Sequence, residues 1–186
     1  MTIVITSGDP SGIGPEIVQK AWICLKKNPL NEFFWIGDPL HLPDNSIPWQ
    51  QIEHPDQASK VFGDALPILI HKFAHPIKVG QHQPENAADI IKVIKRAVSL
   101  VKTNKAKALC TSPINKNVLM SGANFPYTGH TEFLANLDAI DNPVMMLACS
   151  KLKVVPLTTH IPLKDVPDRI SKKLLTETIK ITNAAM

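Results

Sequence analysis

One long amphipathic pattern between two short apolar runs limits the folds open to this chain. Across residues 84–103 apolar side chains recur at helical spacing, with basic side chains on the outer face. Short β-prone runs lie on either side, at residues 66–71 and 106–111. A strand, a helix and a second strand in this order predict an α/β fold built on a largely parallel sheet.

The rest of the chain repeats this alternation. A helix is expected over residues 15–27, because Pro15 suits its first turn and Glu16 complements the helix dipole there. A last helix is expected after Ser171, a favourable N-cap residue. Further strands are predicted at 2–6, 33–36, 144–148 and 153–158, short helices at 116–120 and 131–137, and mostly loop at 37–55 and 73–83.

Composition narrows the class of protein. The net charge is +4, but the longest basic run is two lysines and only two residues are arginine, so we expect no nucleic-acid partner. The first ten residues lack a signal-peptide pattern, and no apolar run reaches the roughly 20 residues that span a bilayer. These features predict a cytoplasmic protein without membrane contact. The three cysteines form no CxxC pair and are expected to be small buried side chains in a reducing compartment.

Two polar loops follow predicted strands, where α/β sheets bind ligands. Residues 8–16 combine three glycines with a helix start, which suits either a tight βα turn or the approach of an anion. The spacing matches neither the Walker A loop nor the dinucleotide fingerprint. Residues 111–116 gather hydroxyls, an amide and a lysine, which suits either a phosphate or carboxylate site or a solvated loop.

Two histidines stand out by position. His130, with Thr131 beside it at a helix start, is suited to hydrogen bonding with a substrate or to general base catalysis. A capped helix with a surface histidine is the alternative. His160 ends a predicted strand and is either one metal ligand or a loop histidine, because no neighbouring residue forms a ligand pair with it. The remaining histidines are expected at the surface: His41, His54, His71, His75 and His82.

Five motifs occur in order along the chain: GDPSGIGPE at 8–16, SPINK at 112–116, FPYTGHTEFLA at 125–135, VMML at 144–147 and VVPLTTHIPLKDVPDRI at 154–170. Together they resemble the 4-hydroxythreonine-4-phosphate dehydrogenase family of pyridoxine biosynthesis. The resemblance implies two α/β/α lobes, similar to isocitrate and isopropylmalate dehydrogenases, that are incomplete at the C-terminus here. Residues 1–111 would form the first lobe, completed by missing C-terminal chain, and residues 112–186 would begin the second.

The same resemblance implies a reaction. The family oxidises 4-phosphooxy-L-threonine with NAD, or with NADP, and decarboxylates the product to 3-amino-2-oxopropyl phosphate on the route to pyridoxal phosphate. A divalent metal polarises the alcohol and then the ketone; zinc is expected, with magnesium or cobalt as alternatives. The family is homodimeric and shares its active site between subunits.

Residue by residue, His130 and Thr131 match the family's substrate-binding pair, and His160 matches its first metal ligand. Asn115 stands where some members carry a histidine, and no catalytic role is assigned to the adjacent Lys116. Two further metal histidines, other substrate-binding residues and most of the NAD site lie beyond the matched region in the family. This chain is therefore expected to be an inactive N-terminal fragment of the dehydrogenase.

Two alternatives stay open. Related enzymes oxidise D-threonate or D-erythronate 4-phosphate, and the residues present do not separate these substrates from the amino-acid phosphate. The chain is otherwise a non-catalytic remnant that binds phosphate or dimerises, which the missing ligands favour.

Overall fold

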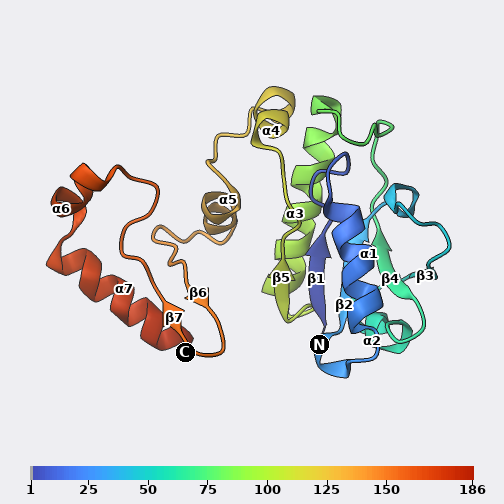
Figure 1. Ribbon diagram of the computed structural model, residues 1–186, viewed down its shortest axis with the longest axis horizontal. Helices are drawn as coiled ribbons and strands as arrows, with labels where there is room; N and C mark the ends of the chain where they lie inside the picture. The colour runs from blue at the N-terminus through green and yellow to red at the C-terminus, as the bar shows by residue number, and fades with distance from the viewer. Residues whose placement is uncertain (1) are drawn as a thin grey trace. The chain divides into compact units, whose positions relative to one another are not determined.

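The computed structural model describes residues 2–186, which fall into two compact units, Met1–Asp138 and Ala139–Met186. The first unit is built on a five-stranded parallel sheet with strand order β3-β4-β2-β1-β5 (Figure 1). This confirms the predicted α/β class. The predicted lobe boundary at residue 111 refers to the complete protein and stays a prediction. The strands are β1 (Ile3–Thr6), β2 (Phe33–Gly37), β3 (Trp49–Gln51), β4 (Leu66–Ile70) and β5 (Ala108–Cys110).

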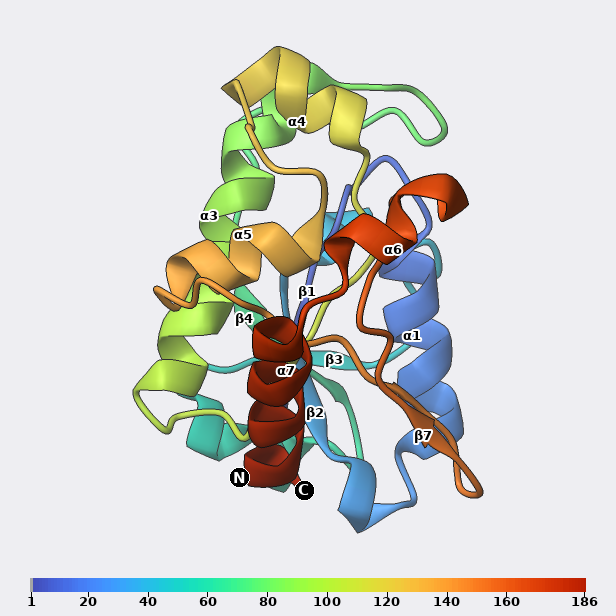
Figure 2. The same ribbon diagram turned by 90° about the vertical axis from the view of Figure 1, so that its left-hand side faces the viewer.

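Helices cover both faces of this sheet. Helix α1 (Gly14–Leu25) lies on one face and α3 (Ala87–Lys102) on the other (Figure 2). Alternate side chains of β2 serve the two cores: Trp35 belongs to the cluster that includes Trp22 of α1, and Phe34 to the cluster that includes Val93 of α3. Strands buried on both faces are typical of parallel sheets, which explains the continuous apolar run in β2.

The order of the strands creates a switch point. From β1 the chain passes through α1 to β2 on one side, and later through α3 to β5 on the other side of β1. The loops after β1 and β5 therefore lead to helices on opposite faces of the sheet. In open α/β sheets, ligands bind in the crevice at such a switch point.

Two short helices complete the first unit. Helices α4 (Lys116–Ala123) and α5 (His130–Leu137) join the start of α3 in a third apolar cluster. Three aromatic rings, those of Phe125, Tyr127 and Phe133, contact one another there with centroids 5.0–5.1 Å apart. The remaining short helices of this unit are η1 (Pro29–Asn31), η2 (Pro39–His41), η3 (Pro55–Gln57), α2 (Ala58–Val61) and η4 (Pro84–Asn86).

The second unit is small. Strands β6 (Leu147–Ala148) and β7 (Lys153–Val154) form an antiparallel pair, followed by η5 (Leu163–Asp165), α6 (Val166–Arg169) and α7 (Lys172–Ala185). The hydroxyl of Ser171 accepts a hydrogen bond from the Leu174 N–H at 3.1 Å, which confirms the predicted cap. Across residues 2–186, the structure contains no helix with both the length and the apolar character needed to span a bilayer.

Several expectations were wrong. β3 lies in a region predicted as loop. The prediction failed because the exposed WQQ sequence has no apolar alternation, and this segment is a strand through its backbone pairing with β4. The strands expected at 144–148 and 153–158 are only two residues long in the structure, as β6 and β7. All three cysteines are exposed rather than buried. Cys110, for example, lies on β5 at the edge of the sheet, where no neighbouring strand covers it.

Candidate functional site

The loops after β1 and β5 meet at the switch point. The Asp9 N–H donates to the Pro113 carbonyl at 2.9 Å, and the Ser112 N–H donates to the Thr6 hydroxyl at 3.1 Å. Gly8 has φ +67°, and a Cβ at this position would lie 2.5 Å from the Pro113 oxygen. The contact between the loops therefore requires a residue without a side chain, and glycine meets both demands.

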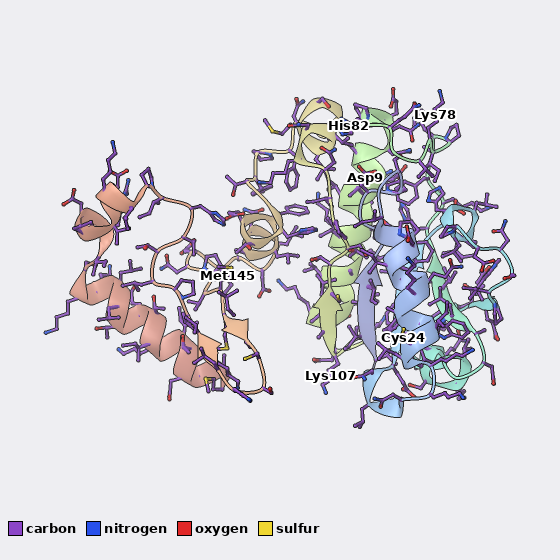
Figure 3. All side chains as sticks on the ribbon, in the orientation of Figure 1. Asp9, Cys24, Lys78, His82, Lys107 and Met145 are labelled. Carbon is purple, nitrogen blue, oxygen red and sulfur yellow. The ribbon has the colours of Figure 1, made fainter. Side chains whose placement is uncertain are left out.

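A hollow of about 520 Å³ lies between these loops. We call it the strand-end pocket. Its walls are Asp9 and residues 11–13 after β1, residues 80–82 before η4, and residues 113–116 after β5. Figure 3 labels Asp9 and His82 together at this end of the first unit, with Cys24 further down α1. Two polar motifs that are a hundred residues apart in sequence thus line one pocket.

The pocket carries both signs of charge. Burial raises the pKa of Asp9, which is 8% exposed, while the hydrogen bond from the Ser11 N–H (3.0 Å) and the nearby His82 act in the opposite direction. Lys116 is exposed at the first turn of α4, whose start is capped by the Asn115 side chain. A pocket of this kind can bind a polar ligand with an anionic group near Lys116 and a hydrogen-bonding group near Asp9.

His130 and Thr131 begin α5, as predicted to within one residue. Among the residues described, the half-buried imidazole of His130 has an Nε2 atom without a hydrogen-bond partner. Burial lowers the pKa of His130, so the neutral ring prevails at pH 7. Thr131 is exposed, and the buried Phe133 anchors the helix below both residues. Helix α5 therefore presents a neutral imidazole and a hydroxyl from adjacent positions. The substrate-binding role of the pair stays a prediction.

His160 lies in the second unit, exposed, between β7 and η5, with φ +57°. Nowhere in residues 2–186 do three or more histidine, cysteine, aspartate or glutamate side chains gather in a group able to hold a metal ion. Catalytic zinc takes about three protein ligands, so His160 alone does not make a metal site here. The role of His160 as one of several ligands stays a prediction.

Sequence reasoning missed a polar cluster between the loop after β4 and α3. His71 and His41, expected at the surface, are half-buried, and both imidazole rings contact the Phe73 ring. The Nε2 atom of His71 lies 3.5 Å from the Asp89 carboxylate, which also accepts from the Ala74 N–H at 3.0 Å. Burial lowers the pKa of both imidazoles. The buried Asp89, at a helix position that reads as polar, is the one sequence signal for this cluster.

Comparison with known proteins supplies the family. Residues 29–186 match the family model described as pyridoxal phosphate biosynthetic protein PdxA. Two relatives named 4-hydroxythreonine-4-phosphate dehydrogenase, from Ruegeria sp. (strain TM1040) and Roseobacter denitrificans, are 47% and 46% identical over 99% of this chain. The chain covers 56% of each, so it spans little more than half the length of these relatives.

A solved structure shows the same fold. The crystal structure of a 4-hydroxythreonine-4-phosphate dehydrogenase from Burkholderia phymatum aligns with a TM-score of 0.88 and 31% identity, over 98% of this chain and 57% of that one. The family match, the relatives and the fold agree with the five motifs in the sequence. This chain belongs to the PdxA family of pyridoxal phosphate biosynthetic proteins.

Proposed function

We propose that the complete protein oxidises 4-phosphooxy-L-threonine with NAD and decarboxylates the product to 3-amino-2-oxopropyl phosphate. This chain contributes the strand-end pocket, the substrate-binding pair His130 and Thr131, and the metal ligand His160. The observation that carries the proposal is the meeting of two family motifs, at residues 8–16 and 112–116, at the switch point of the sheet. The relatives at 47% and 46% identity bear the name of this dehydrogenase.

The residues present have definable tasks in this reaction. The neutral His130 ring has an unpartnered nitrogen, which suits a hydrogen bond to a substrate hydroxyl or phosphate oxygen. The exposed Thr131 hydroxyl supplies a second hydrogen bond one residue further along. NAD, when bound, accepts the hydride that leaves the alcohol carbon. Within residues 2–186 there is neither a dinucleotide fingerprint nor a group of three metal-binding side chains.

Other features belong to the whole protein. We propose NAD, or NADP, as cofactor, and a divalent metal: zinc, with magnesium or cobalt as alternatives. We also propose a homodimer in the cytoplasm with an active site shared between subunits. The alternative is a non-catalytic remnant that binds phosphate or dimerises, and it is consistent with the lack of a three-ligand metal cluster within residues 2–186.

The roles of the two histidines are separable by mutation. We would fuse residues 1–186 to the remaining C-terminal part of the Ruegeria relative and measure bound metal together with kcat and KM. His160→Ala is expected to abolish metal binding, because no other side chain in the described part of the chain replaces that ligand. His130→Ala is expected to raise KM or lower kcat with metal retained.

The matched control is His75→Ala, since His75 is exposed and only its backbone N–H is hydrogen bonded. It should change neither metal content nor kinetics. Unchanged metal stoichiometry in His160→Ala, or loss of metal in His130→Ala, would show that the two roles are assigned wrongly. Oxidation of D-erythronate 4-phosphate in preference to the amino-acid phosphate would identify the sugar-acid alternative.

A further inference from the structure

Gln83 lies at the centre of a hydrogen-bond cluster beside the strand-end pocket. Its Oε1 atom accepts from the Ser11 hydroxyl at 2.6 Å and from the Lys78 N–H at 2.6 Å. Its Nε2 atom donates to the Pro76 carbonyl at 3.0 Å. One half-buried amide therefore satisfies partners on both sides of a loop and on the turn after β1.

The segment just before Gln83 in the sequence forms one wall of the pocket. Residues 78–82, which we call the strap, turn back at Gly80, where φ is +77°. The Gly80 N–H donates to the Ser11 carbonyl at 2.8 Å, so the strap touches the same serine through its backbone. Residues 80–82 of the strap line the same pocket as Asp9.

Residues 74–75, which precede the strap, are held by separate contacts. The Ala74 N–H donates to the Asp89 carboxylate at 3.0 Å, and the His75 N–H donates to the Asn86 side-chain oxygen at 3.3 Å. Both acceptors are buried at the start of α3. These contacts hold the base of the loop without Gln83, whereas the hydrogen bonds of Gln83 and Ser11 link the strap to the turn after β1.

We propose that Gln83 is a positioning residue for the strand-end pocket: it holds the strap against the turn after β1 and so holds His82 beside Asp9. The chain of contacts is direct. Ser11 donates its hydroxyl proton to Gln83 and its N–H to Asp9, so the amide and the carboxylate are joined through one 3%-exposed serine. The use of this geometry to bind substrate or cofactor rests on the proposed function, whereas the geometry itself does not.

The test compares two substitutions of equal length in the 186-residue chain. Gln83→Met keeps the volume of the side chain but removes all three hydrogen bonds. Gln83→Glu keeps an acceptor for the Ser11 hydroxyl and the Lys78 N–H. Val79→Ala is the control, since Val79 is on the strap, 79% exposed and outside the pocket walls.

Two NMR readouts report on the strap. The first is amide hydrogen exchange at Lys78 and Gly80, which should be about tenfold faster in Gln83→Met, because a lost hydrogen bond lowers protection by about that factor. The second is the set of nuclear Overhauser contacts between the protons of Gly80 and Ser11, which the 2.8 Å backbone hydrogen bond brings together and which should vanish in Gln83→Met. Both readouts should regain their wild-type values in Gln83→Glu and should keep them in Val79→Ala.

If the Gln83→Met variant exchanges its Lys78 and Gly80 amide protons like the wild type and keeps the Gly80–Ser11 contacts, the positioning role is refuted. If Gln83→Met does not fold, Ser11→Ala replaces it in the test, because it removes the hydrogen bond between the Ser11 hydroxyl and Gln83. The double variant should be no worse than Gln83→Met, because both changes remove the same bond.

Affinity for NAD and for 4-phosphooxy-L-threonine, measured on the same samples by chemical-shift titration, separates this inference from the proposed function. A wild-type chain that shifts at His82 on titration, with weaker binding in Gln83→Met and recovery in Gln83→Glu, supports both. The functional use of the pocket is decided by the same titration on the chain fused to the remaining part of the Ruegeria relative. A fusion that binds neither ligand counts against that use, while hydrogen exchange and the Gly80–Ser11 contacts still decide the positioning role.

Discussion

Replacing Gly8 by alanine tests the contact that creates the site. Gly8 has φ +67°, and an added Cβ would lie 2.5 Å from the Pro113 oxygen and 2.8 Å from the Ser112 Cβ. A side chain at positive φ costs about 1–2 kcal/mol. Forcing a methyl group against packed backbone costs about 1–3 kcal/mol more. We therefore expect Gly8→Ala to lower the free energy of unfolding by about 2–5 kcal/mol, a large part of the roughly 5–15 kcal/mol of an ordinary domain.

Two other glycines separate these terms. Gly80 also has positive φ, at +77°, but a Cβ there meets nothing within 4 Å. Gly80→Ala should therefore show the conformational cost alone, about 1–2 kcal/mol. Gly63 has neither the positive φ nor a neighbour within 4 Å, so Gly63→Ala should change stability by about 0.5 kcal/mol or less.

The assay is urea unfolding followed by tryptophan fluorescence. All three tryptophans belong to the first unit, and two of them, Trp22 and Trp35, are fully buried. The signal therefore reports on the unit that contains the three glycines. If Gly8→Ala unfolds at the same urea concentration as Gly63→Ala, the loops do not approach as described and the account of the switch point fails.

Three further predictions concern the same unit. Trp22→Phe removes the hydrogen bond from Nε1 to the Phe62 carbonyl (2.8 Å) and should cost about 1–3 kcal/mol by urea unfolding, since it leaves a buried acceptor unpaired; a cost near zero would mean that water replaces the bond. Asn115→Ala removes the cap of α4 and should cost about 1 kcal/mol, with a smaller loss contradicting the capping role. Asp9→Asn keeps an acceptor for the Ser11 N–H. Because the folded pKa of Asp9 is raised, its contribution to stability is present at low pH and is lost as pH rises through that pKa. The variant should therefore gain stability relative to the wild type as the pH rises from 3 to 7. A relative loss of stability over this range would mean that the folded pKa of Asp9 is lowered rather than raised.

The elements that sequence predicted well are those with strong local signals. The helix over 84–103 became η4 followed by α3, and the cap at Ser171 is present, because periodicity and capping are properties of neighbouring residues. Strand β3 escaped prediction because only its pairing with β4 makes it a strand. The exposed cysteines were misjudged for a related reason, since residue type alone does not say which side of α1 or which edge of the sheet is covered.

The site residues likewise include some that local sequence signals predicted and some that they did not. The two glycine- and hydroxyl-bearing loops were identified because each follows a predicted strand, and the structure brings them together at the strand ends. Gln83 was not identified. Its bond to Ser11 joins residues 72 positions apart, and a glutamine in a loop carries no local signal for such a partner. The half-buried His71 was missed likewise, because its neighbour Asp89 comes from α3.

NADH formation tests the central claim most directly. Residues 1–186, fused to the remaining part of the Ruegeria relative, would be given 4-phosphooxy-L-threonine, NAD and a divalent metal, with the unfused chain assayed in parallel. The account predicts that the fusion produces NADH, that 3-amino-2-oxopropyl phosphate accumulates, and that the unfused chain forms neither. A folded fusion that binds metal but forms no NADH would contradict the proposed function, and turnover by the unfused chain would contradict the conclusion that its own residues do not complete the site.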